Sequence, residues 1–210
     1  MNAIVVRCAL PLAAFALAGC FSIDLGRPGS ATGQYRLTGS AQAAQSAPVH
    51  AARTDTRALL VAPLAASSVD DSFALAYARS TQARAPYQFA TWSERPSAQL
   101  AQLLVEQLAA RRSFASVALL GRGVAGDLQL NLVVVDFYHD VPSASARVRI
   151  DVELVDRASR GLVARRGFEA AAPVPQANAA GAAAALDAAA KQALDALVAW
   201  LETGPATPAP

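Results

Sequence analysis

The chain has 210 residues, and its 18 basic and 16 acidic side chains leave a net charge of only +2. This length suits one domain with a substantial core, and such a balanced charge does not favour a nucleic-acid partner. Along the chain, apolar periodicity is confined to the middle. The sequence therefore predicts one folded domain between two segments that carry little structural information.

An export signal is predicted at the N-terminus. Arg7 precedes an apolar run, residues 8–18, that would span about 16 Å as a helix, half of a bilayer's hydrocarbon core and too short for a transmembrane helix. The run ends in Leu-Ala-Gly-Cys, which resembles the lipobox of bacterial lipoproteins. This resemblance implies a signal peptide over residues 1–19, cleavage between Gly19 and Cys20, and covalent lipid on the Cys20 sulfur, with no other cofactor expected.

Lipid on Cys20 would anchor the mature chain, because two or three acyl chains hold a protein durably where one holds it marginally. Phe21 follows the cysteine, and by the usual sorting rule of Gram-negative bacteria this implies the outer membrane, with the domain facing the periplasm. Removal of residues 1–19 also removes Cys8, which excludes an intramolecular disulfide. The alternative is an ordinary secreted protein with an incidental cysteine at this position.

Two segments carry almost no core-forming pattern. Residues 20–56 are rich in Ser, Ala, Gly and Gln, and we expect the lipid anchor and a flexible tether that reaches about 33 Å on average. Residues 203–210 contain three prolines and are expected to form a disordered tail. The folded domain is therefore predicted over residues 57–202.

The first half of this domain predicts short strands around one helix. The helix begins at Pro96, because leucines recur at helical spacing with Gln and Glu between them. Ser97 is expected to cap it, and Arg111 and Arg112 suit its C-terminal end. The strands are expected from apolar runs over residues 57–64, 73–78, 86–92 and 114–120.

The second half predicts a long antiparallel hairpin, a further strand over residues 161–170 and a helix over about residues 177–202. The period of two places one apolar set on the core face: Leu128, Leu130, Leu132, Val134, Val148, Ile150, Val152 and Leu154. The other face of the second hairpin strand carries Arg147, Arg149, Asp151 and Glu153. We expect these charges to face solvent, the alternative being contact with a partner or with another copy of the chain.

The final helix has an apolar stripe that includes Leu186, Leu194 and Leu201, and a second face with Asp187, Lys191 and Asp195 at steps of four residues. Together these elements predict an α+β fold: a single two-layer domain, with a mostly antiparallel sheet and two helices packed on one face. Trp92 and Trp200 are expected to cover the core rather than to anchor a partner.

Motifs for catalysis are absent from the sequence, so we do not expect an enzyme. Asp136, His139 and Asp140 are the candidate metal ligands. In a strand the two aspartates lie on one face and His139 lies on the opposite face, so the three side chains do not converge. We therefore favour a solvated loop end and expect no metal site. His50 lies in the predicted tether. The glycine-rich segment Gly121–Gly126 leads into a strand rather than a helix, which excludes a dinucleotide-binding turn.

The order of these blocks resembles the ABC-type transport auxiliary lipoproteins, the PqiC-like components of MCE/ABC lipid transport systems. The resemblance runs from about residue 34, where Tyr35 matches a short tyrosine strand, to residue 202, and the segment 65–72 departs from the family pattern. None of the matched residues is catalytic. We expect a structural role for the motif residues Tyr87, Trp92, Pro96, Asp156 and Phe168, as for the further matches Phe114, Val117 and Leu154.

The resemblance implies a non-enzymatic auxiliary component of a machine that moves lipids between the inner and outer membranes. The expected partners are an MCE-domain periplasmic protein, the ABC permease and ATPase, outer-membrane lipids and a second copy of the chain. The alternative is a lipoprotein that scaffolds or regulates envelope assembly, as peptidoglycan-synthase activators and LPS-assembly proteins do. A lipid-anchored hydrolase is disfavoured because the sequence has no nucleophile motif.

Overall fold

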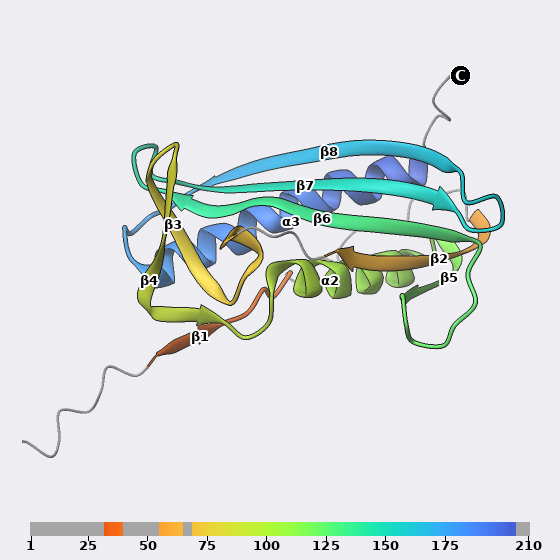
Figure 1. The fold of residues 1–210 in the computed structure, drawn as a ribbon, viewed down its shortest axis with the longest axis horizontal. Coiled ribbons are helices and arrows are strands. Elements are labelled where there is room, and N and C mark those ends of the chain that lie inside the picture. The colour runs from red at the N-terminus through yellow and green to blue at the C-terminus, as the bar shows by residue number, and fades with distance from the viewer. Residues whose placement is uncertain (1–31, 40–54, 65–68, 205–210) are drawn as a thin grey trace, which may run out of the picture. The chain divides into compact units, whose positions relative to one another are not determined.

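The computed structural model describes residues 32–39, 55–64 and 69–204 (Figure 1). The predicted signal peptide, the cleavage site at Gly19, the lipid site at Cys20 and His50 lie outside these residues, as does the predicted tail from residue 205 onward. In chain order the elements are β1 Gly33–Tyr35, β2 Asp55–Leu64, η1 Val69–Asp71, β3 Ala74–Ser80, β4 Ala83–Trp92, α2 Pro96–Arg111, β5 Phe114–Leu119, β6 Leu128–Asp140, β7 Ser145–Asp156, β8 Leu162–Pro173 and α3 Ala179–Thr203.

Strand β6 is the central strand of the sheet and pairs with three other strands. On one side it pairs along its whole length with β7, which pairs in turn with β8, and both ladders are antiparallel. On its other side β6 pairs in parallel with two different strands, first with β2 and then, through residues 138–140, with β3. Strand β5 extends the sheet beyond β2, and β4 and β1 extend it beyond β3. The longest ladders are therefore antiparallel, as predicted, while parallel pairings join the shorter strands.

Both helices cover the same face of the sheet, which confirms the predicted α+β architecture. Helix α2 packs on β2, β5 and β6, and α3 packs on β6, β7 and β8 (Figure 1). Asn178 caps α3, because its side-chain oxygen accepts a hydrogen bond from the Gly181 amide at 2.8 Å. None of the helices in the described ranges is both long and apolar enough to cross a membrane.

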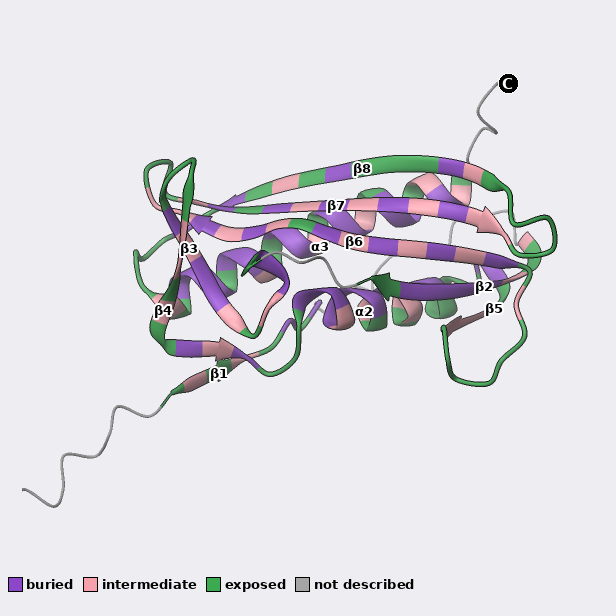
Figure 2. Cartoon of the chain, in the orientation of Figure 1, coloured by how far each residue is buried: buried purple, intermediate pink, exposed green. Residues whose placement is uncertain are grey.

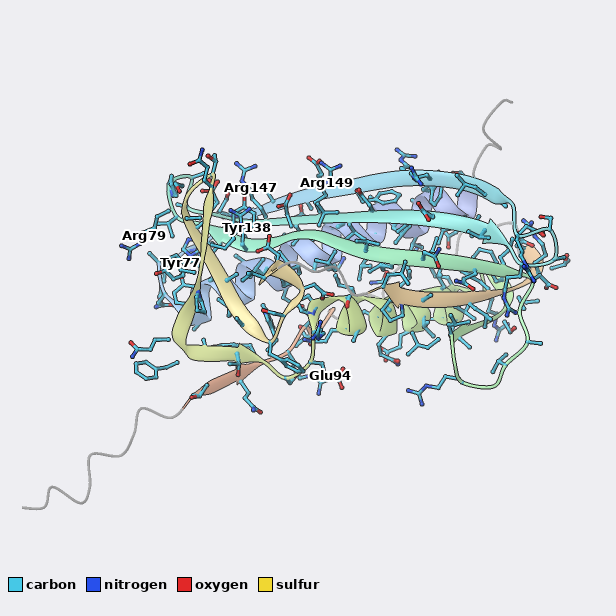
Figure 3. The ribbon with its side chains drawn as sticks, in the orientation of Figure 1. Tyr77, Arg79, Glu94, Tyr138, Arg147 and Arg149 are labelled. Carbon is cyan, nitrogen blue, oxygen red and sulfur yellow. The ribbon has the colours of Figure 1, made fainter. Side chains whose placement is uncertain are left out.

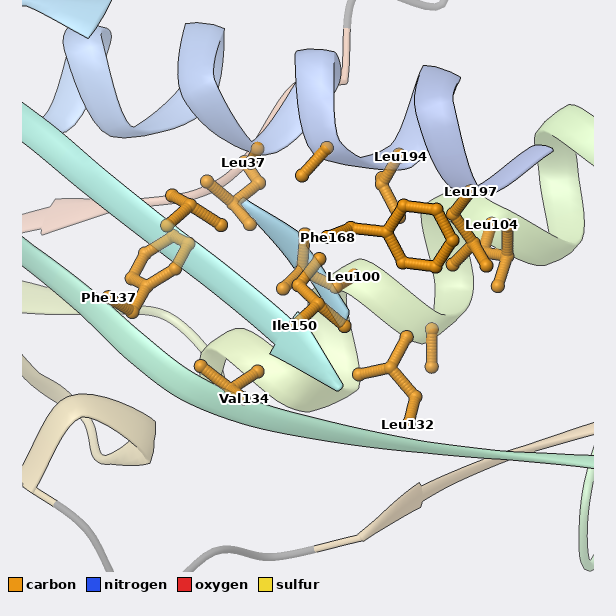
Figure 4. Close-up of a cluster of buried hydrophobic side chains, with 14 of the residues drawn as sticks. Leu37, Leu100, Leu104, Leu132, Val134, Phe137, Ile150, Phe168, Leu194 and Leu197 are labelled. Atoms are coloured by element: carbon orange, nitrogen blue, oxygen red, sulfur yellow. The ribbon is translucent and has the colours of Figure 1, made fainter. Parts of the chain in front are cut away.

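The core lies between the two helices and the sheet face they cover. Buried side chains alternate with more exposed ones along β6 and β7, so the predicted period of two is confirmed (Figure 2). Leu100 and Leu104 of α2 meet Leu194 and Leu197 of α3 over this face (Figure 4). Phe168, 5% exposed, fills the space beside them from β8.

A β-bulge at Val135 changes which residues of β6 face the core. The register with β7 shifts between Val134 and Asp136. Before the bulge the even-numbered residues are buried, and after it Phe137 and His139 are buried instead. A strand read with an unbroken period of two cannot reveal this shift, because the bulge inserts one extra residue.

The prediction of a tether over residues 20–56 is wrong at Asp55 and Thr56, which begin β2, and for residues 32–39. This segment, which we call the strap, forms β1 beside β4 and places Leu37 in the core at 3% exposure. The Leu37 amide donates to Gln99 Oε1 of α2 at 2.7 Å, and the Thr38 amide donates to Asp187 Oδ1 of α3 at 2.8 Å. The strap has too few apolar residues to show a period, so in the sequence only the family resemblance at Tyr35 indicated a strand here.

The expected cap of helix α2 is also wrong. Arg95 occupies the N-cap position without a capping side chain, and Ser97 lies inside the first turn. The cap comes instead from Asp71 of η1, whose Oδ1 accepts a hydrogen bond from the Ser97 amide at 2.8 Å. Asp71 is fully buried, so a carboxylate distant in sequence satisfies the start of the helix and complements its dipole.

Candidate functional site

Most of the motif residues predicted from the sequence have packing or turn positions. Trp92, 2% exposed, meets Phe137 edge-on at 5.5 Å between ring centroids. Pro96 is the buried first residue of α2, where its missing amide hydrogen costs nothing. Phe168 packs against Trp200 at 5.7 Å. These contacts agree with the expectation that both tryptophans cover the core.

Asp156 holds the turn between β7 and β8. Its Oδ1 accepts hydrogen bonds from the Ser159 amide at 2.8 Å and from the Ser159 hydroxyl at 2.9 Å. The hydrogen bond from the Ser159 amide is the main reason that the pKa of Asp156 lies below its usual value. Arg160 follows with a positive φ of 59°, so the turn is tight at this point. Asp156 therefore has a local, structural position far from the other motif residues.

Tyr87 is the motif residue that lines a cavity. Its hydroxyl lies 2.6 Å from Nδ1 of His139, and its ring lies 4.9 Å from that of Tyr77. A cavity of about 370 Å³ opens here, at the end of the sheet where the chain enters α3. Tyr77 and the exposed Arg79 also line it, and Figure 3 shows both side chains at this end of the domain.

Burial sets the electrostatics of this cavity. It lowers the pKa of His139 below 6.5, and the nearby Asp140 charge opposes that effect only in part. Burial likewise raises the pKa of Tyr87 above 10.0. Both groups are therefore uncharged at neutral pH. The cavity offers aromatic faces, uncharged hydrogen-bonding groups and the Arg79 cation to whatever contacts it.

The candidate metal ligands Asp136, His139 and Asp140 all lie in the last part of β6. As predicted, Asp136 and Asp140 share the open face of the sheet while His139 points to the other side. The prediction of a solvated loop end is wrong for His139, which is 1% exposed because the bulge turns it inward and Tyr87 covers it. In residues 32–39, 55–64 and 69–204, no three or more His, Cys, Asp or Glu side chains are grouped to hold a metal ion.

A cluster of charged residues missed by the sequence analysis lies beside η1. Arg84 Nε is 3.4 Å from the Asp70 carboxylate, and Arg84 Nη2 is 3.5 Å from Asp136 Oδ1. The Arg84 guanidinium also lies over the Tyr138 ring, 3.5 Å from its centroid. Burial raises the pKa of Asp70, and the charge of Arg84 offsets this only partly. The signal in the sequence was the acid pair at positions 70 and 71, inside the segment that departs from the family pattern.

The open face of β6, β7 and β8 carries a row of ion pairs. Arg147 Nε lies 2.9 Å from Asp140, and Arg149 Nη1 lies 3.1 Å from Glu169. Glu153 pairs with Arg165 of β8. Figure 3 shows Arg147 and Arg149 projecting from the sheet. These side chains are partly or largely exposed, so the expected solvated face agrees with their positions.

A second cavity, of about 530 Å³, separates the strap from the outer side of α2. Gln99 stands at its inner wall and joins two segments, because its Oε1 accepts from the Leu37 amide while its Nε2 donates to the Glu94 carbonyl at 2.7 Å. Arg36 and Glu94 contribute charges of opposite sign to the lining. The strap therefore forms one wall of this groove.

The fold of this domain is similar to that of other solved proteins. Among solved structures, a DUF330 protein from Xanthomonas campestris is 22% identical with a TM-score of 0.68, covering 81% of this chain and 95% of its own. An uncharacterized protein is 15% identical with a TM-score of 0.62, covering 81% of this chain and 99% of its own. At these identities the likeness shows a shared fold. A search of curated proteins finds no match.

A match to a family model shows which protein family the chain belongs to, whereas the solved structures show only a shared fold. The model for the ABC-type transport auxiliary lipoprotein component matches residues 35–198, from the last residue of β1 into α3. The match thus includes the strap from Tyr35 onward, all of α2, the long strands β6, β7 and β8, and α3 as far as Val198. Because it extends over most of the sequence, the chain belongs to the ABC-type transport auxiliary lipoprotein family.

Proposed function

We propose that this protein is an outer-membrane-anchored periplasmic lipoprotein that acts as a non-enzymatic auxiliary component of an ABC/MCE-type intermembrane lipid transport system. The family match over residues 35–198 carries this proposal. The lipobox that ends at Cys20 supports it, since an auxiliary lipoprotein requires an acylated cysteine at the start of its mature chain. The domain would contribute binding surfaces to the transporter.

The anchor is tested with Cys20→Ala, and Cys8→Ala serves as a matched control because Cys8 lies within the predicted signal. The wild type and Cys8→Ala should incorporate radiolabelled palmitate and fractionate with the outer membrane. Cys20→Ala should incorporate none and leave the membrane fraction. Persistent labelling of Cys20→Ala would show that the lipid is attached elsewhere and that the lipobox interpretation is wrong.

The transport role is tested by crosslinking in intact cells, followed by purification of the acylated protein from membranes and identification of the proteins that accompany it. Recovery of an MCE-domain protein, with or without an ABC permease and ATPase, is the expected result. Recovery of cell-wall synthases or LPS-assembly proteins alone would contradict it and support a scaffold or regulator of envelope assembly. The Cys20→Ala protein is the control for contacts that depend on membrane attachment.

A further inference from the structure

We propose that the end of the domain formed by β1 and β4 rests directly on the lipid surface to which Cys20 is attached. The inference depends on the proposed anchor at Cys20. It adds an orientation and a contact surface, with a bilayer that contains anionic phospholipids as the occupant. Three independent features of the chain lead to it: the length of the connection, the fixed exit point of the strap, and the side chains exposed beside that exit.

The connection between anchor and domain is short. Thr32, where the described strap begins, is twelve positions after Cys20, so the two points lie at most about 43 Å apart even if the chain is fully extended. Had the domain begun at Asp55, the corresponding limit would be about 125 Å. Docking of the strap therefore shortens the maximal reach roughly threefold, and it holds the start of β1 near the membrane.

The strap fixes the point from which this connection leaves the domain. Gly33 pairs with Ala90 of β4, and three hydrogen bonds run from the strap to the Asp187 carboxylate of α3. One of them joins the Thr38 hydroxyl to Asp187 Oδ2 at 2.6 Å. Leu37 lies in the core between these contacts. The strap is thus attached to the sheet and to both helices, and its first residues cannot move far from β4.

The side chains beside this exit suit a lipid surface. Phe89 is 49% exposed and directly precedes Ala90, the partner of Gly33 in the ladder. Phe73, 51% exposed, lies beyond the other edge of the same strand, where its carbonyl accepts from the Trp92 amide. Exposed aromatic side chains favour the boundary between headgroups and acyl chains.

The charge at this end has the sign that anionic lipids attract. Arg36, Arg79 and Arg95 are exposed, and no acidic side chain of the described residues lies within ion-pair distance of them. Glu94 is an exposed acid in the same region. On the open face of β6 to β8, by contrast, the arginines already have carboxylate partners. Uncompensated arginines beside exposed aromatics favour a phospholipid surface over bulk water.

The opposite end of the domain supplies a matched control. Leu162 begins β8 and is 47% exposed, nearly the same fraction as Phe89. It pairs with Val155, close to the first residues of β6, whereas β3 joins the last residues of that strand and β4 lies beyond β3. Nine residues of β6, or about 30 Å, therefore separate the level of Leu162 from the level at which β3 joins that strand.

The test uses the acylated full-length protein in vesicles of phosphatidylethanolamine and phosphatidylglycerol whose acyl chains carry bromine as a quencher. Phe89→Cys or Leu162→Cys is labelled with an environment-sensitive fluorophore, since Cys20 is blocked by lipid in the mature chain. We expect brominated lipid to quench the label at position 89 at least about twofold and to leave the label at position 162 unchanged. Asp187→Ala, which removes three hydrogen bonds of the strap, should reduce quenching at position 89, and Asp195→Ala should not.

Acylation is measured by mass spectrometry, and vesicle attachment by flotation, on the same samples. If Cys20 is acylated and the protein floats but position 89 is quenched no more than position 162, the contact surface is wrong while the anchor stands. Phe89 would then be free for a protein partner. If Cys20 carries no lipid, both the anchor and the orientation that depends on it are overturned.

Discussion

At the scale of single residues, two buried polar side chains each complete a contact with another element. Asp71 is fully buried and satisfies an amide at the start of α2, and His139 is buried against the hydroxyl of Tyr87. Burial of a polar group without a partner costs more than its hydrogen bond contributes. These contacts therefore determine how the β3–β4 hairpin and η1 sit on the rest of the domain.

Asp71→Ala should lower the free energy of unfolding by about 1–2 kcal/mol, because it removes the cap of α2. Ser97→Ala is the matched control: Ser97 was the cap expected from the sequence, but in the structure it supplies only the backbone amide. Its hydroxyl can be removed with little change. Urea denaturation of both variants decides between the two caps, and a larger loss for Ser97→Ala would show that the contact with Asp71 does not stabilise the helix.

The stability of the protein should fall as the pH decreases from about 7 to 5, in part because of His139. Burial holds the pKa of His139 in the folded protein below the value of 6.5 expected for the unfolded chain. Over that interval the unfolded chain binds more protons, so acid favours unfolding. This contribution is complete above pH 6.5 and is lost as the pH falls toward the folded-state pKa.

His139→Gln removes that titration, so the difference in unfolding free energy between variant and wild type should narrow at the acid end of the range. Asp70 has the opposite sign, because its raised pKa favours the folded state at lower pH, and its contribution cancels in the comparison. Chemical denaturation at several pH values measures the difference. Parallel curves for the two proteins would show that His139 does not titrate as inferred.

At the scale of elements, the strap is held to the rest of the fold by few contacts, all with residues distant in sequence. It contributes one short strand at the edge of the sheet and one core side chain, and a single carboxylate, Asp187, accepts three of its hydrogen bonds. The sequence predicted that Asp187, Lys191 and Asp195 would share one helix face at steps of four residues. In the structure Lys191 pairs with Asp195 at 2.5 Å, as this spacing favours, while Asp187 binds the strap. One helix face therefore supports two separate contacts.

Asp187→Ala should raise the hydrogen-exchange rates of the Thr38 and Gly39 amides by about tenfold or more while changing the global stability little, since local opening requires only these contacts to break. Asp195→Ala, two turns further along α3, should leave both rates unchanged. Exchange measured by NMR or mass spectrometry distinguishes the cases. Equal acceleration by both variants would mean that α3 loosens as a whole.

At the scale of the whole molecule, the sheet divides the domain into a packed side and a solvated side. Neighbouring residues of β7 belong to different environments: Leu154 is 1% exposed in the core, and Glu153 pairs with Arg165 on the open face. Close packing makes the core sensitive to any lost volume, whereas exposed ion pairs are screened by solvent. Stability therefore comes mainly from the helix-covered side, and the open side remains available for contacts.

Leu154→Ala should reduce the free energy of unfolding by about 2–5 kcal/mol, because a buried cavity replaces the side chain. Glu153→Ala, one residue earlier, should cost less than about 1 kcal/mol. Denaturant unfolding of the two variants provides the comparison. Similar losses for both would show that the ion pairs of the open face stabilise the domain as strongly as its core does.

The elements that depend on local pattern were predictable. The leucine spacing of α2, the apolar stripe of α3 and the alternation along β6 and β7 are each visible within about a dozen residues, and the family resemblance followed from their order. The candidate site was only partly predictable. Tyr87 was identified as a motif residue, but its contact with His139 joins positions 52 residues apart.

The sequence by itself determined the two-layer architecture and the lipobox prediction at Cys20, because periodicity and a short motif are local properties. Only the tertiary structure decided which carboxylate caps α2, where the bulge turns His139 inward and how residues 32–39 attach to the domain. Each of these depends on partners brought together by folding: Asp71 meets the start of α2, and Leu37 meets Gln99, 62 residues away. Such contacts leave no periodic trace in the sequence, since one well-placed side chain at each end is enough to form them.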